Sequence, residues 1–110
     1  MTTNLNIHAR NAIERVTTST RRTLVDYGRG EAPASAVVSA TKGLRAQSRA
    51  TRKIAPREAD AILGTAALVG ILVSASERAR EANDINLSDD RVREAFRALD
   101  TLCTTLEIRS

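Results

Sequence analysis

Aromatic side chains are almost absent from this sequence, since Tyr27 and Phe96 are the only two among 110 residues. The core must therefore be built from Ala, Val, Leu and Ile, and small side chains of this kind let helices approach one another closely. The same scarcity argues against the aromatic platform on which single-strand nucleic-acid binders stack bases.

Cysteine and membrane signals are also sparse. Cys103 is the only cysteine, so no intramolecular disulfide can form and a reducing compartment fits. Residues 1–6 lack the charged start and apolar run of a signal peptide. The longest uncharged stretch, residues 61–76, has 16 residues, whereas a membrane-spanning helix needs about 20 predominantly apolar ones. We therefore expect a soluble, cytoplasmic protein that does not associate with a membrane.

Motifs that carry catalysis or bind metal are missing as well. The sequence contains no G-x-S-x-G, H-E-x-x-H or C-x-x-C pattern and no phosphate-binding glycine loop. His8 is the only histidine and lies near the terminus, where we expect a solvated side chain. Cys103 lies among apolar residues at helical spacing, which is typical of a small buried side chain rather than a nucleophile. We expect a protein that is not an enzyme, with no catalytic residue, cofactor or metal.

Hydrophobic periodicity predicts an all-α fold, a compact bundle of about four helices that forms one domain over residues 1–110. The predicted helices cover about residues 4–27, 33–53, 56–82, and 88 to the C-terminus. The first has one apolar face, made by Ala9, Ile13, Val16, Thr20, Leu24 and Tyr27. The second has only a thin apolar stripe, made by Ala36, Ala40, Leu44, Gln47, Thr51 and Ile54.

The third predicted helix, about residues 56–82, is apolar on every side in its middle section. Pro56 suits its first turn, and Ile62, Leu63 and Leu68 point in three different directions around the helix. Such a helix is typically enclosed by its neighbours, so we expect it to be the central one. Small residues at a spacing of four would let another helix approach closely; they are Ala66, Gly70 and Ser74.

The fourth predicted helix has a clear start signal at Ser88. Ser88 is placed as the N-cap, and Leu87 with Val92 as a hydrophobic staple across it. An amphipathic seam then continues towards the C-terminus through Val92, Ala95, Phe96, Leu99, Leu102, Cys103 and Leu106.

Charge is unevenly distributed between the two halves of the chain. Residues 1–57 carry eleven basic and three acidic side chains, whereas residues 58–110 carry six basic and ten acidic ones. No carboxylate lies between Glu31 and Glu58. Such asymmetry indicates a docking surface for something negative, either a nucleic-acid backbone or an acidic protein.

Basic residues of the second predicted helix fall within an arc of about 100° and form the candidate partner-binding face. They are Lys42, Arg45, Arg49, Arg52 and Lys53. Arg15, Arg21 and Arg22 would extend this face if the first two helices lie side by side. Fifteen of the 17 basic residues are arginine, which suits bidentate contact with phosphate or carboxylate. A GC-rich genome would raise arginine and alanine without any role in binding, and a charge run can also be a merely solvated face.

No run of residues matches a family motif. Small, motif-free helical proteins are common among phage and mobile-element inhibitors, including anti-CRISPR proteins. The first hypothesis is therefore a non-enzymatic inhibitor that blocks a nucleic-acid-handling protein complex through its basic helical face. The alternative is a direct nucleic-acid-binding module or a small transcriptional regulator. The third is a homodimeric structural subunit, so the chain is expected to be a monomer or a homodimer.

Overall fold

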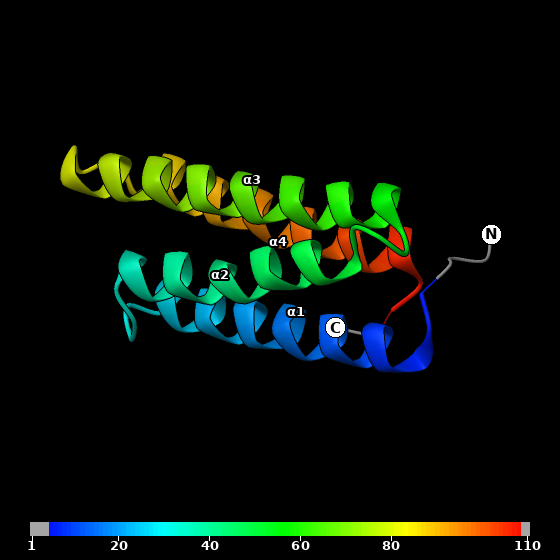
Figure 1. The fold of residues 1–110 in the computed structure, drawn as a ribbon. Helices are drawn as coiled ribbons and strands as arrows, with labels where there is room; N and C mark the ends of the chain where they lie inside the picture. The colour runs from blue at the N-terminus through cyan, green and yellow to red at the C-terminus, as the bar shows by residue number, and fades with distance from the viewer. Residues whose placement is uncertain (1–4, 109–110) are drawn as a thin grey trace.

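Four helices joined by short connections account for most of the chain (Figure 1). The computed structural model describes residues 5–108. Its helices are α1 (Ile7–Gly28), α2 (Ala34–Thr51), α3 (Pro56–Glu81) and α4 (Ile85–Leu106). They form a ring in which α1 packs against α2 and α4, and α3 packs against the same two helices. The predicted all-α bundle of four helices is thus confirmed, with an apolar α3.

The predicted boundaries of α1, α2 and α3 agree with the structure to within about three residues. The expected start at Asn4 lies outside the described residues. Asn6 caps α1 by accepting a hydrogen bond from the amide of Ala9 at 2.8 Å. Hydroxyl side chains in the middle of α1 bond to carbonyls of their own helix, as between Thr17 and Ile13 at 2.7 Å. Packing thus overrides the poor helix propensity of residues 16–20.

The buried face of α2 differs from the predicted stripe. Ile54 is 53% exposed and lies beyond the helix, and Ala36, Ala40 and Gln47 are only partly buried. The fully buried side chains include three hydroxyls, which a hydrophobic pattern does not count; the set is Val37, Thr41, Leu44, Ser48 and Thr51. Ser48 donates to the carbonyl of Ala59 on α3 at 2.7 Å. The predicted stripe was therefore correct at Leu44 and Thr51 and missed Val37, Thr41 and Ser48. A buried hydroxyl with a partner is compatible with a core, and a search for apolar side chains passes over it.

The predicted N-cap of α4 is also wrong. The helix begins at Ile85, three residues earlier, and Asp84 caps it by accepting from the amide of Leu87 at 3.1 Å. Ser88 is instead buried, and Leu87 is 39% exposed rather than stapled. A left-handed residue, Asn83 (φ 61°), ends α3 and leaves Asp84 free to start the next helix at once. The apolar seam of α4 is buried as expected, with Phe96 partly exposed.

The expectation that α3 is enclosed on all sides is wrong. Ile62, Val69 and Val73 are buried between α2 and α4, but Ile71 is 64% exposed and Leu68 45% exposed. Only α2 and α4 pack against α3, so no other helix of residues 5–108 covers its remaining side.

Among the described residues, α3 is the helix long and apolar enough to cross a membrane, and 39% of its most apolar window is buried inside the bundle. A core helix of a soluble protein meets the same criterion. The compact arrangement of the four helices is consistent with a soluble protein.

A buried polar cluster joins α1, α3 and α4 at one end of the bundle. The Tyr27 hydroxyl donates to Glu77 Oε2 at 2.6 Å and lies 3.1 Å from Ser76 Oγ. Ser76 is 2.7 Å from Ser88, and Arg80 donates to Ser88 and to the backbone carbonyl of Tyr27. The Arg80 guanidinium also lies 4.0 Å from the centre of the Tyr27 ring. Together these contacts link two helices, α1 and α3, that lie diagonally across the ring.

Replacing Tyr27 with Phe should lower the free energy of unfolding by about 1–3 kcal/mol, because the partners of the hydroxyl lose a buried hydrogen bond. Urea denaturation measures the change, with the exposed Ser39→Ala as the control. A loss no larger than that of the control would contradict a stabilising role for the cluster.

The free energy of unfolding should also fall at high pH, as the phenol of Tyr27 loses its proton. Burial raises the pKa of its phenol, and the hydrogen bond to Glu77 raises it further. The folded chain therefore holds this proton more tightly than the unfolded chain. The resulting stabilisation is complete below the ordinary tyrosine pKa of about 10 and is lost as the pH rises above it. Wild-type stability should drop more steeply than that of Tyr27→Phe between about pH 9 and 11, and parallel curves would contradict this.

Candidate docking surface between α2 and α3

The basic face predicted on the second helix lies on the side that meets α3, but α2 ends at Thr51, so Arg52 and Lys53 belong to the turn after it. Lys42, Arg49 and Lys53 are exposed, and no ion pair reaches any of them within residues 5–108. Arg52 pairs with Asp60 of α3 at 2.8 Å, so the neighbouring helix supplies an acid that the sequence of α2 lacks. Arg45 is half-buried and lies over the junction between the two helices.

The basic face does not continue onto α1 through Arg15, Arg21 and Arg22, as was expected if the first two helices lay side by side. Although α1 and α2 do pack together, the α2 residues that contact α1 include Ala40 and Gly43, on the flank of α2 away from its basic face. Arg21 turns towards α4, where it pairs with Asp100 and lies 5.8 Å from the centre of the Phe96 ring.

The other two arginines of the expected extension lie on the outer side of α1. Arg15 and Arg22 line a shallow hollow formed by α1 alone, together with Glu14, Thr18 and Ser19. None of the three α1 arginines therefore adjoins the basic face of α2.

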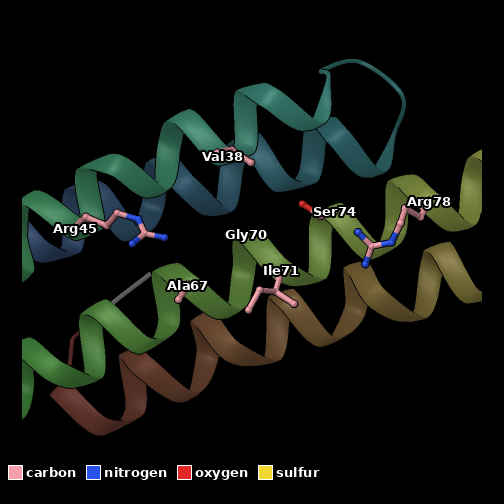
Figure 2. A pocket seen from close by; sticks show the side chains of 7 residues that line it. All are labelled: Val38, Arg45, Ala67, Gly70, Ile71, Ser74 and Arg78. Atoms are coloured by element: carbon pink, nitrogen blue, oxygen red, sulfur yellow. The ribbon is translucent and has the colours of Figure 1, made fainter.

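A groove between α2 and α3 adjoins the basic face instead. It has a volume of about 510 Å³ and is lined by Val38, Arg45, Ala67, Gly70, Ile71, Ser74 and Arg78. Figure 2 shows Arg45 and Arg78 at opposite ends of the groove, with Gly70 on the α3 backbone between them. These two arginines are the only charged side chains among its described lining residues. The groove thus combines a positive charge at each end with an apolar middle.

Two exposed aliphatic side chains line this groove, Ile71 (64% exposed) and Val38 (41% exposed). The exposure of this side of α3 is what the sequence analysis missed. Scattered exposed aliphatic residues need no explanation, but a group beside a groove marks an interaction site. A sequence signal for this surface was present. The middle of α3 is apolar on every side, whereas a helix in a four-helix ring has only two neighbours to cover it.

A second groove lies on the opposite flank of α3, against α4. It has a volume of about 330 Å³ and is lined by Ala61, Gly64, Thr65, Leu68, Ala98, Thr101, Leu102 and Thr105. Its described lining contains no charged side chain, so it offers no electrostatic selection of a partner. The groove beside α2 is therefore the stronger candidate.

The residues considered for chemistry lie apart from both grooves. His8 is exposed at the start of α1, and Cys103 is buried in the seam of α4, as predicted. Within residues 5–108, no group of three His, Cys, Asp or Glu side chains is arranged to hold a metal ion. What the groove offers is binding, through guanidinium groups that suit carboxylates or phosphates and an apolar floor that suits aliphatic side chains.

Comparisons with protein-family models, with curated proteins and with solved structures give no match to this chain. Its function therefore has to be inferred from its own surface.

Removing the exposed aliphatic groups should leave the fold almost unchanged. We expect Ile71→Ser and Val38→Ser each to change the free energy of unfolding by less than about 1 kcal/mol, because both side chains already contact water. Leu99→Ala, at a fully buried position, should cost about 2–5 kcal/mol in the same urea titration. A loss at Ile71 as large as that at Leu99 would show that the fold itself needs this surface.

Proposed function

We propose that this chain is a non-enzymatic docking protein that binds an acidic surface of another protein through the basic face of α2. The supporting observation is the combination of exposed cations that form no ion pair within residues 5–108, Lys42, Arg49 and Lys53, with the exposed aliphatic side chains Val38 and Ile71 in the adjoining groove. Protein interfaces pair charged groups at the rim with apolar contact at the centre.

The aliphatic component favours protein over nucleic acid as the partner. Phosphate contacts need only cations, and base stacking needs aromatic side chains. Tyr27 is buried and Phe96 is half-buried beneath Arg21 of α1, so neither adjoins the basic face. Ile71 and Val38 have no use on a phosphate backbone, whereas they suit the aliphatic side chains of a protein.

The setting that fits best is inhibition in the cytoplasm of a complex that handles nucleic acid. A compact basic domain can occupy an acidic protein surface of such a complex without carrying out any reaction. The proposal places this chain with the small helical inhibitors of phages and mobile elements, such as anti-CRISPR proteins. Direct binding of nucleic acid is the second candidate, favoured by the unpaired cations alone.

Neutralising the exposed cations tests the proposed function. The triple variant Lys42→Gln, Arg49→Gln, Lys53→Gln should lose at least about tenfold in binding to a defined acidic partner captured from host lysate. A control variant removes the same charge elsewhere, through Arg15→Gln, Arg22→Gln and Arg97→Gln, and should retain the partner. Titration of both variants and the wild type with the purified partner gives the affinities.

Titration of the wild type against random duplex and single-stranded nucleic acid at two salt concentrations separates the alternatives. We expect no binding at physiological salt. Salt-sensitive binding that the triple variant weakens on every sequence would contradict a protein partner and favour the nucleic-acid-binding module. A melting temperature that rises with protein concentration would instead favour the homodimeric subunit.

A further inference from the structure

We infer that the groove between α2 and α3 binds one acidic, amphipathic α-helix of the partner. This inference deepens the proposed function and rests on it, because it names the element of the partner that the surface recognises. The proposed function is tested through Lys42, Arg49 and Lys53, which do not line the groove, whereas this inference depends on the groove wall at Gly70 and on Arg78, so the two can fail separately.

The length and walls of the groove suit a helix. Ala67 and Arg78 are eleven residues apart on α3, which corresponds to about 16 Å, or three turns, at 1.5 Å per residue. Both walls are helices, and a third helix between them would pack by the same ridge-and-groove contacts that hold the bundle together. Within the described residues there is no exposed sheet edge on which an extended peptide could add a strand.

Charge selects an acidic occupant. Arg45 and Arg78 lie at the two ends of the groove, and no acidic side chain is among its described lining residues. Arg45 also continues into the exposed cations Lys42 and Arg49. A docked helix should therefore place carboxylates about three turns apart, one near each arginine, with aliphatic residues between them to cover Val38 and Ile71.

A glycine in the wall of the groove has no role in the internal packing of the chain. A Cβ atom at Gly70 would meet nothing within 4 Å, and neither would one at Gly64 in the second groove. Glycine in the middle of a helix is less favourable than alanine. An occupant packed closely against α3 would make use of the missing side chain at Gly70, whereas the fold alone does not.

These two glycines give a matched pair of variants. Both Gly70→Ala and Gly64→Ala should raise the thermal midpoint by roughly 2–6 °C, because alanine favours a helix and neither Cβ is obstructed. Only Gly70→Ala should weaken docking, since Gly64 lies in the groove beside α4. A variant that is more stable yet binds more weakly separates an effect on docking from an effect on folding.

The probe is a synthetic helical peptide of about 18 residues, with leucine and alanine along one face and two glutamates eleven positions apart on its flank. Its control has lysine in place of both glutamates. In NMR titrations, the acidic peptide should shift the amide signals of Val38, Arg45 and Ile71, and the lysine peptide should not. Gly70→Ala and the pair Arg45→Gln, Arg78→Gln should each weaken binding at least about tenfold, and Gly64→Ala less than twofold.

Several results would overturn the inference. They are the absence of binding by the acidic peptide at low salt, equal binding of both peptides, and shifts confined to α1 or α4. Tighter engagement of the same amides by duplex DNA or by vesicles of phosphatidylcholine and phosphatidylserine would assign the groove to nucleic acid or lipid. A dimer that Ile71→Glu converts to a monomer would assign it to a second copy of the chain.

The natural partner distinguishes this inference from the proposed function. If the triple lysine and arginine variant abolishes capture while Gly70→Ala and Ile71→Ser retain it, the helix in the groove is wrong and the proposed function stands. If none of these variants affects capture, both are wrong.

Discussion

The packing of α3 between α2 and α4 is the constraint on which the rest of this structure depends. α3 is apolar around most of its circumference, but the ring of four helices gives it only two neighbours. One side of α3 is therefore buried in the core through Ile62, Val69 and Val73, and the other leaves Ile71 and Leu68 in water. The aliphatic exposure of α3 at Ile71 and Leu68 follows from this arrangement, and Ile71 lines the groove beside α2.

Hydroxyl side chains complete a core that has few aromatic residues. Thr17, Thr20 and Thr51 are buried, and each donates to a carbonyl of its own helix. The largest buried side chain, Tyr27, connects diagonally opposed helices through Ser76 and Glu77. These bonds satisfy buried polar groups locally, so the bundle can pack closely with small side chains. Lys42 and Arg49 of α2 take no part in this core and are exposed on the surface.

The sequence predicted the number of helices, their order and most of their boundaries, because strong periodicity and proline or glycine breaks are local signals. It misplaced the start of α4, since Ser88 has the chemistry of a cap but is buried against Ser76. It predicted a basic face on the second helix, and the structure places Lys42, Arg45 and Arg49 on α2 and Arg52 and Lys53 in the turn that follows it. It could not say that this face meets α3 rather than α1, or that Arg21 turns to Asp100, because those facts depend on how the helices are arranged.

The central claim is that the groove between α2 and α3 contacts an acidic protein. Photo-crosslinking in the natural host tests it most directly, with a photoreactive residue in place of Ala67 in the groove or of Arg22 on the outer side of α1. The account predicts a discrete adduct with one acidic protein from position 67 and none from position 22. Adducts of equal yield from both positions, or an adduct at position 67 with nucleic acid or with a second copy of the chain, would contradict it.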